Sequence, residues 1–533
     1  MSQEKEALAA RLALEIAKRF GSSSERRPGV SAAVRVPAAP ELVSSETSQP
    51  PLGSSLGETL AETAPVPERK ARGAQKGHKG HGRSIPPELP REEHEHILPE
   101  SERTCPACGL PYRESSLTDT SEEVDVQVKV VVIRHIRKCY RPACACPEAR
   151  PLLVAPIPPK LIPKGKFTVQ TWVKLLLDKY LAQLPVNRQR LLLAQAGLPI
   201  SKGTIHGGFN RLQDYLVPLY EHFLAHLRQM EHIHADETRW MIFEDVAGKA
   251  NHRWWLWLFA STDVVCLVLD PHRSAAAPFK ALSEPLPKDM PPPSDPACVM
   301  RKIEDQIYIF TPNLKCISAD RYPVYPSLSP TIQVAFCWAH QRRDFTDFQA
   351  AHAQQADQMA WAAAWIAKIG HLYQLNEDRL AELADPQAGV TAQTALELAL
   401  AAIAQQVAAR KDLPFPQRKL LESMHAHWPG LTFFVSHPEI PMDNNLAERY
   451  IRMPVVGRKN YLGHQTQRSG QMGAILYSIV LTCQLHGISP FDFLTRYFQV
   501  CAEDHAPPPD LTPFSPWLKP TAPETKPPSS PTE

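Results

Sequence analysis

The stretch that decides the fold begins with HIHADETRWMIFE (232–244) and continues through RWWLWLFAS (253–261) and VVCLVLD (264–270). Each run is rich in β-branched and aromatic residues, which favour extended strands. The second and third runs are apolar almost throughout, as is typical of strands covered on both faces. Two further runs of this kind follow, LKCISAD (314–320) and IQVAFCWAH (332–340). The sequence therefore predicts a sheet of five strands.

Helical patterns lie on both sides of this predicted sheet. Residues 167–229 have helical spacing of apolar residues, and Ser201 is placed to cap one of these helices. Residues 346–430 are rich in Ala, Gln and Leu, which predicts a long helical block. Further helices are expected between 443 and 500, and a Pro-rich insertion occupies 283–297. Strands and helices mixed in this way predict an α/β domain.

Composition and charge exclude several classes of protein. The 533 residues contain 58 Lys and Arg against 56 Asp and Glu, so the formal net charge is +2. A hydrophobic fraction of 43% excludes a wholly disordered chain, while 53 prolines indicate linkers. The apolar run nearest in length to a membrane helix, 254–268, is interrupted by polar residues at 261–263. The N-terminus has no apolar signal region, so we expect a cytosolic protein whose 11 cysteines stay reduced.

The two ends of the chain differ in composition from its middle. Residues 1–20 are expected to form an amphipathic helix, either a short coiled coil or a frayed tail helix. Residues 21–68 are interpreted as a disordered linker, and residues 69–100 as a basic Gly-rich arm. The charge of this arm suits a phosphate partner and is equally typical of a solvated linker. Residues 506–533 are expected to be a disordered Pro-rich tail.

Three carboxylates stand where they could form one site. Asp236 and Asp320 fall on predicted strands, and Glu448 lies on a predicted helix one turn after Asn444. Burying a carboxylate is costly unless it is paired or binds a metal. Three carboxylates could hold Mg²⁺ or Mn²⁺, and two such ions can clamp the attacking and leaving oxygens of a phosphodiester. Either aspartate taken alone would more often be a turn or cap residue.

Basic residues accompany these carboxylates. Five Lys and Arg follow Glu448 within 20 residues, and no acidic residue occurs again before Asp492. A basic run that begins beside a metal-ligand candidate favours a polyanionic substrate over a solvated surface. Tyr461 and His464, within this run, could stack on unpaired bases. The predicted DNA contacts are Lys76, Lys79, Arg83, Arg342, Arg343, Arg449, Arg452, Arg458 and Lys459.

A cluster of cysteines predicts a zinc-binding module over residues 101–150, on short strand-like pieces such as 124–136. Cys-Pro-Ala-Cys-Gly at 105–109 is a knuckle that suits Zn²⁺, and the second half of the cluster is irregular. A structural Zn²⁺ would stabilise a segment too small to build its own core. The expected ligands are Cys105, Cys108, Cys144 and Cys146, with Cys139 as the alternative to one of the last two.

Two further sequence patterns contain histidine. Cys337 and His340 have Cys-x-x-His spacing, but no second pair stands nearby, so a packing role is favoured. His232, His234 and Asp236 alternate along one predicted strand and would share a face, so they could bind a hydrolytic Zn²⁺. A zinc hydrolase leaves the basic segments unexplained and is the less favoured interpretation.

The motifs, taken in order, resemble those of transposases of the bacterial insertion sequence 66 family. In the N-terminal half these are AQKGHKGHGR, CPACG, ACAC, LIPKGK and KYLAQLPVNRQRLLLAQAGLPISKGT. In the C-terminal half they are HADETRW, ADRYPVY, CWAHQRRDF and MDNNLAERYIRMPVVGRKNYL. Together they extend over roughly residues 70–500. The presence of Cys139 before Tyr140 departs from the family pattern, which leaves the second cysteine pair open.

The resemblance implies an α/β catalytic core of ribonuclease H-like type over residues 230–500, with a helical insertion at about 346–430. A zinc-binding module and a helical DNA-binding region at 160–229 would precede it. The family pattern places an Asp–Asp–Glu triad at Asp236, Asp320 and Glu448, with Mg²⁺ or Mn²⁺ as the implied cofactor.

The implied activity is metal-dependent cleavage and strand transfer of double-stranded DNA at the terminal inverted repeats of an insertion sequence and at target DNA. The implied partners are further copies of the chain in a synaptic complex and accessory proteins encoded by the same element. The expected location is the bacterial cytoplasm at the nucleoid. The alternative is a catalytically silent protein of the same descent that binds DNA ends and represses its element.

Overall fold

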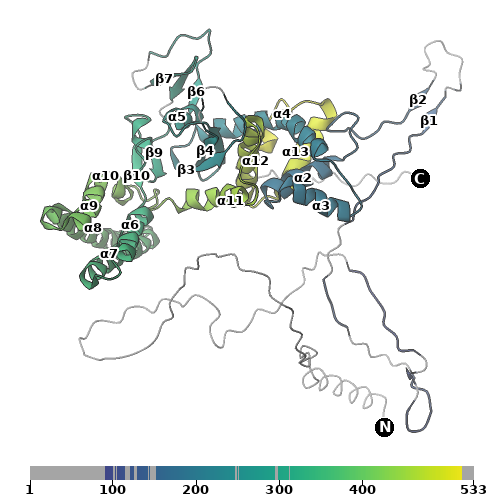
Figure 1. Cartoon of the computed structure of the whole chain (residues 1–533), viewed down its shortest axis with the longest axis horizontal. Coiled ribbons are helices and arrows are strands. Elements are labelled where there is room, and N and C mark those ends of the chain that lie inside the picture. Colours follow the sequence, from purple (N-terminus) through teal and green to yellow (C-terminus); the bar gives the residue numbers. More distant parts are fainter. Residues whose placement is uncertain are drawn as a thin grey trace, which may run out of the picture. The chain divides into compact units, whose positions relative to one another are not determined.

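Figure 1 shows the computed structural model of the chain. It describes residues 91–99, 102–103, 105–113, 120–124, 129–141, 143, 152–246, 249, 251–294, 298–310 and 313–518. The chain divides into two units, Met1–Val128 and Lys129–Glu533. The predicted helix at 1–20, the linker at 21–68 and the basic residues Lys76, Lys79 and Arg83 lie outside the described residues.

The second unit begins with a small antiparallel ribbon, in which β1 (Cys139–Tyr140) pairs with β2 (Leu153–Val154). The valine-rich run 124–136 was predicted to form short strand-like pieces, and its described part, 124 and 129–136, forms neither a strand nor a helix. Its side chains are exposed, and Val132 is 94% exposed. A run of β-branched residues is not enough to make a strand, because the backbone needs a partner strand as well.

Three helices come before the central sheet, namely α2 (Val169–Tyr180), α3 (Val186–Gln195) and α4 (Lys202–Leu227). Ser201 caps α4 as expected, because its hydroxyl accepts a hydrogen bond from the backbone N–H of Thr204 at 3.1 Å. α2 and α4 cross closely at Gly208, where a Cβ atom would overlap the ring of Trp172. The glycine therefore permits the contact between these helices.

The five predicted strand runs form one mixed sheet in the order β5–β4–β3–β9–β10. Its strands are β3 (His232–Met241), β4 (Arg253–Ala260), β5 (Val265–Asp270), β9 (Cys316–Ala319) and β10 (Gln333–Phe336). The first three are antiparallel neighbours, whereas β9 and β10 run parallel to β3. β3 pairs with β9 only through 232–234 but with β4 through 234–241, so one edge of its second half has no partner strand among the described residues.

Two helices from the C-terminal part, α11 (Asn445–Tyr461) and α12 (Gln467–Leu485), pack on this sheet, and α13 (Pro490–Asp504) packs against α2 and α12. α12 also closes the edge at β5. Ser478 and Thr482, one helical turn apart, accept hydrogen bonds from the backbone N–H groups of Leu267 at 2.8 Å and Val265 at 3.0 Å. These side chains satisfy donors that an edge strand would otherwise leave open. α11 lies against β3 and carries residues of the candidate site.

Two insertions extend from the sheet (Figure 1). The first contains α5 (Ala276–Leu282) and a small antiparallel sheet of β6 (Ser283–Pro285), β8 (Gln306–Phe310) and β7 (Val299–Ile303), where only a Pro-rich connection was expected. The second contains α6 (Trp338–Ala351), α7 (Ala356–Ala381), α8 (Pro386–Ala408), α9 (Phe415–Ala426) and α10 (Trp428–Leu431). These helices bury a separate core that includes Trp365, Leu372 and Leu400. No helix in the described ranges is long and apolar enough to span a membrane.

Short 3₁₀ helices lie at Tyr325–Ser327, Ala409–Asp412, Phe433–Val435 and Thr512–Phe514. The last of these belongs to the segment 506–533, which was predicted to be disordered throughout. That prediction is wrong for 506–518, because Phe514 is buried and the ring of Trp517 stacks on His226 of α4 at 4.0 Å. Two aromatic side chains can anchor a Pro-rich segment, since each buries a large apolar area. Residues 519–533 lie outside the described residues.

We expect Trp517→Ala to lower the free energy of unfolding by about 1–3 kcal/mol, because a half-buried indole loses its contacts with α4. Chemical denaturation of the full chain, followed by circular dichroism, measures this. Leu518→Ala is the matched control, since Leu518 is adjacent and exposed. Equal midpoints for the Trp517 variant and the wild type would contradict the anchoring role.

Candidate active site

Asp236, Asp320 and Glu448 converge at the middle of the sheet. Asp236 lies on β3, Asp320 directly follows the neighbouring strand β9, and Glu448 is in the first turn of α11. The backbone N–H of Glu237 donates to Asp236 at 2.8 Å, and that of Tyr322 donates to Asp320 at 3.0 Å. Each aspartate is therefore oriented by the chain that follows it.

The three carboxylates are close enough for their charges to shift the pKa of Asp236. The pKa of Asp236 is raised to about 7, chiefly by burial. The negative charges of Glu237, Asp320 and Glu448 raise this pKa further, while the hydrogen bond from the N–H of Glu237 lowers it. Negative charge is therefore costly at this position in the protein alone, and a bound cation would relieve the cost.

Asn444 fastens the start of α11 to the sheet. Its side-chain amide donates to the carbonyl of Ala235 at 2.7 Å and accepts from the Nδ1 of His234 at 2.9 Å. Its backbone N–H donates to the Sγ of Cys337 at 3.2 Å. Asn444 is 1% exposed. These contacts set the position of Glu448, one turn further along, relative to Asp236.

Glu237 is a fourth acidic residue at the site that the sequence analysis did not select. Its carboxylate forms an ion pair with Arg273, in which the Nε lies at 3.0 Å, and accepts a hydrogen bond from the hydroxyl of Tyr325 at 2.6 Å. Burial raises its pKa, and these two partners oppose that shift. Because Glu237 has protein partners for its charge, it is the weaker candidate for a metal ligand.

The packing role predicted for Cys337 and His340 is correct only for Cys337, which is buried and bonded to Asn444. Burial raises the pKa of Cys337 to about 11, so the thiol stays protonated at neutral pH. His340 instead lies beside the carboxylates, with its Nδ1 at 3.6 Å from the Oε1 of Glu448. Among the described residues, Cys337, His340 and Glu448 bring one ligand atom each within 4.8 Å of one another.

The histidines of β3 do not form the zinc site that was considered for a hydrolase. The Nε2 of His232 is bonded to the hydroxyl of Ser318 at 2.8 Å, and His234 is bonded to Asn444. Burial lowers the pKa of His232 to about 4, so its ring is neutral at physiological pH. Both histidines tie β3 to neighbouring elements, which is a structural role.

The chain matches a family model over the part that contains this site. The model described as Transposase IS66 family matches residues 164–472, more than half of the chain, and this range contains all three carboxylates. The chain belongs to this family.

Relatives of this IS66-family chain come from Sinorhizobium fredii (strain NBRC 101917 / NGR234). Uncharacterized protein y4jD is 26% identical over 442 residues, which cover 80% of this chain and 79% of the relative. Uncharacterized protein y4qI is 26% identical over 424 residues, which cover 76% of this chain and 72% of the relative. Their names state no activity, so the family match carries the functional argument.

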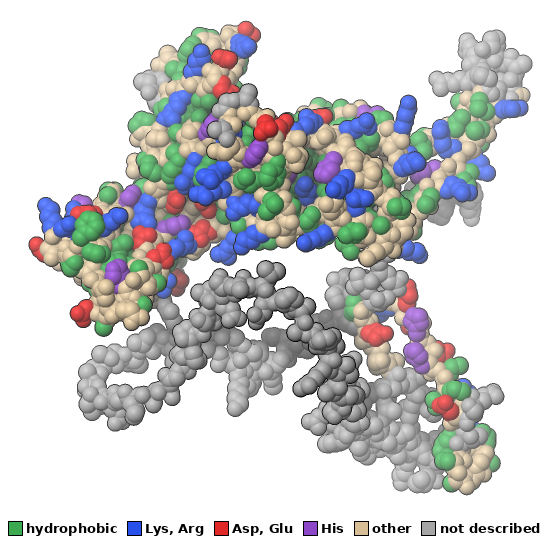
Figure 2. Space-filling model, viewed as in Figure 1, with side chains coloured by type: hydrophobic (Ala, Val, Ile, Leu, Met, Phe, Trp, Pro, Cys, Tyr) green, Lys and Arg blue, Asp and Glu red, His purple; other side chains and the backbone are tan. Residues whose placement is uncertain are grey.

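Membership of a transposase family implies DNA binding, and basic side chains surround the site accordingly. Arg449, Arg452 and Lys459 are exposed on α11 at spacings of three and seven residues, which places them on one helix face. Arg342 and Arg343 are exposed on α6, and Arg343 lies 3.6 Å from the Oε2 of Glu448. Figure 2 shows Lys and Arg side chains gathered over the middle of this face, around α11. Their contact with DNA stays a prediction.

Tyr461 and His464 do not present the stacking surfaces that were predicted for this transposase. His464 is 3% exposed and is held between the indole N–H of Trp240, at 2.9 Å, and the stacked ring of Tyr180. The hydroxyl of Tyr461 is bonded to that of Tyr477. These residues close the core behind α11, because the chain after α11 returns to the end of β3 through a hydrogen bond from His464 to Met241.

The predicted zinc module lies only in part within the described residues. Backbone N–H groups of Ala107 and Cys108 point at the sulfur of Cys105 and lower the pKa of Cys105, which favours the thiolate that metals bind. The turn closes through Gly109, whose φ is +74°. Cys144 and Cys146 lie outside the described residues, and Cys139 is exposed on β1 of the other unit. Zn²⁺ binding and its ligand set therefore both stay predictions.

We expect Cys105→Ser to remove about one Zn²⁺ per chain, since a structural site needs all of its thiolates. The zinc content of the purified full-length protein, measured by elemental analysis, tests this. Cys298→Ser provides the control, because Cys298 lies on the insertion after β5 and outside the cluster. Unchanged zinc in the Cys105 variant would exclude Cys105 as a ligand.

Proposed function

We propose that this protein cleaves and transfers DNA strands as an Asp–Asp–Glu transposase with a ribonuclease H-like core. The observation that carries the proposal is the convergence of Asp236, Asp320 and Glu448 from β3, the end of β9 and the first turn of α11. The mixed sheet, with three antiparallel strands followed by two parallel ones, supports this assignment of the core. The family match supports the substrate class, which is DNA.

The donor atoms at the site fit a divalent cation. The Oε1 of Glu448 and the Nδ1 of His340 are buried, and neither has a hydrogen-bond partner among the described residues. Two aspartates and a glutamate form an oxygen-rich set of the kind that Mg²⁺ and Mn²⁺ prefer. Asp236, Asp320 and Glu448 would hold the ions, whose chemistry is to stabilise negative charge on the phosphodiester oxygens.

The protein's own groups would position the reactants. Arg343 and His340 flank Glu448, each at 3.6 Å from one of its carboxylate oxygens. The basic face of α11 would hold the DNA backbone beside the carboxylates through phosphate contacts. In the first reaction water replaces the 3′-oxygen at a phosphorus atom, and in the second the freed 3′-hydroxyl replaces an oxygen of the target strand. Neither reaction requires a covalent bond to the enzyme.

We place the substrate at the terminal inverted repeats of an insertion sequence and at target DNA in the bacterial nucleoid. Because two ends must be brought together, a homo-oligomer is the expected assembly, and accessory proteins of the same element are candidate partners. The zinc module and the helices α2 to α4 are proposed to take part in binding the ends.

Cleavage of a labelled duplex that carries the element's own terminal repeat tests the proposal. Cutting with Mg²⁺ or Mn²⁺, and none without added metal, is the expected result. Specific binding without cutting, with either metal and with the accessory proteins present, would overturn it in favour of the silent end-binding repressor. Cutting that requires Zn²⁺ would overturn it in favour of a different metal chemistry.

A further inference from the structure

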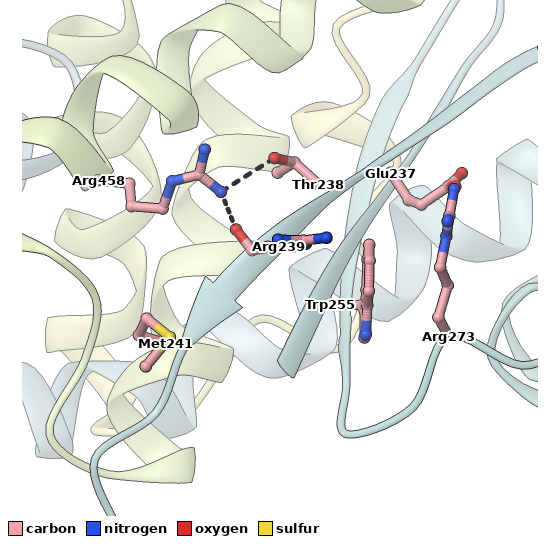
Figure 3. A pocket seen from close by; sticks show the side chains of 7 residues that line it. All are labelled: Glu237, Thr238, Arg239, Met241, Trp255, Arg273 and Arg458. Carbon is pink, nitrogen blue, oxygen red and sulfur yellow. Dashed lines mark hydrogen bonds and ion pairs between the residues drawn. The ribbon is translucent and has the colours of Figure 1, made fainter. Parts of the chain in front are cut away.

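A pocket of about 510 Å³ lies along the half of β3 that lacks a partner strand on one side (Figure 3). Glu237 and Arg239, which line it, are on the face of β3 opposite Asp236, whereas Thr238, which also lines it, shares the face of Asp236. The pocket therefore lies around the edge of β3 next to the candidate active site. Its volume is within the range of about 300–1,000 Å³ that is typical of sites for small organic groups. The exposed side chain of Arg239 borders it, so the pocket is open to solvent.

The pocket carries more positive than negative charge. Arg239, Arg273 and Arg458 line it, and Glu237 is the acidic residue among its lining side chains. Arg273 is paired with Glu237, whereas the described residues give Arg239 and Arg458 no carboxylate partner. Arg458 instead donates to the hydroxyl of Thr238 at 3.0 Å and to the carbonyl of Arg239. Burial and the nearby charge of Arg239 lower the pKa of Arg458, so an anion placed between the two would be stabilised.

An indole ring stands beside these arginines. Trp255 of β4 is directly opposite Arg239 in the register of the sheet, and the guanidinium of Arg239 lies 6.0 Å from its ring centroid. On the other side, Arg273 lies 4.8 Å from this centroid and is fixed in place by Glu237 and by the ring of Tyr322 at 3.9 Å. Figure 3 shows Trp255 between the two guanidinium groups. Arg239 has no comparable anchor in the described structure, so it can move aside and expose the ring.

The geometry points to one unpaired nucleotide as the ligand of this pocket, with its base stacked on Trp255 and its phosphate bound by Arg239 and Arg458. This inference rests on the proposed function, because the nucleotide would belong to the strand that the carboxylates cut. Aromatic stacking selects unpaired bases, since a duplex hides their faces. At about 3.3 Å per residue along β3, Arg239 stands about 10 Å from Asp236, so the nucleotide would lie close to the point of cleavage.

Binding of the full-length protein to two fluorescent DNAs tests the inference without any cutting. One is a blunt duplex, and the other is the same duplex with a short single-stranded extension, both without added Mg²⁺ or Mn²⁺. The wild type should prefer the extended duplex, and Trp255→Ala should lose about tenfold in affinity for it with little change for the blunt one. Trp255→Phe should keep most of the preference, because phenylalanine retains a stacking surface. Arg239→Gln should weaken binding of the extended duplex.

An extension that lacks its bases separates stacking from phosphate binding. The wild type should bind the abasic extension less tightly than the normal one, whereas Trp255→Ala should not distinguish them. Lys302→Gln, which removes an exposed charge from β7, is the control for a general loss of positive charge. Equal preference in the wild type and Trp255→Ala, or an equal loss in Lys302→Gln and Arg239→Gln, would overturn the assignment. Because no cutting is measured, an inactive enzyme would refute the proposed function and leave this result interpretable.

Discussion

Replacement of Asp320 by alanine is expected to reduce strand cleavage by a factor of at least about 10³ while DNA binding changes little. Asp320 follows β9 and its charge acts on Asp236, so removal of its carboxylate takes a proposed oxygen ligand from the centre of the site. The loss should leave the fold intact, because the backbone N–H of Tyr322 is the partner of the carboxylate and lies in a partly exposed turn. Asp236→Ala and Glu448→Gln should have the same effect.

The measurement is the rate of cleavage of the terminal-repeat duplex with Mg²⁺, alongside the affinity for the same duplex. Asp245→Asn is the matched control, since it removes an exposed carboxylate shortly after β3. Cleavage that persists in Asp320→Ala would remove Asp320 from the triad. Loss of both binding and cleavage would show a structural role instead, and thermal unfolding of the variant would then locate the damage.

The strands of the central sheet could be predicted from sequence because their composition and burial agree. RWWLWLFAS forms β4, which lies between two neighbouring strands and is buried along most of its length. The small sheet of β6, β7 and β8 was missed because the prolines between 285 and 296, at the end of β6 and in the connection to β7, indicated a loop. Its turn depends on Glu304, which adopts a φ of +55°. The packed tail was missed for a related reason, since its two aromatic anchors stand among prolines.

The site residues that stand in sequence motifs could be predicted. Those whose role depends on contacts between residues far apart in the chain could not. Asp236, Asp320 and Glu448 stand in recognisable motifs, and their convergence follows from β3 and β9 being neighbours. Glu237 and Asn444 depend instead on partners 36 and 210 residues away, Arg273 and His234. Such pairs cannot be predicted from the spacing of residues along the chain. His464 was wrongly assigned to the DNA-binding surface, because it is a polar residue in a basic run. It is buried in the core instead.

Asn444→Ala is expected to lower the free energy of unfolding by about 2–4 kcal/mol, because it leaves a buried carbonyl and a buried imidazole N–H without partners. The amide of Asn444 donates to the carbonyl of Ala235, so its oxygen must be the atom that faces His234. The Nδ1 of His234 therefore carries a proton and donates it. Chemical denaturation measures the loss, and Asn445→Ala is the control because Asn445 is exposed.

The same variant should lower cleavage about tenfold or more at a temperature where it stays folded, since Glu448 is placed by the start of α11 and small displacements at a reacting centre are costly. A double-mutant cycle with His234→Ala separates this effect from general weakening. If Asn444 acts through its hydrogen bond with His234 of β3, the two substitutions together should lower activity little more than Asn444→Ala alone. Additive losses would mean that the two residues act independently, and Asn444 would then position α11 through its hydrogen bond to the Ala235 carbonyl rather than through His234.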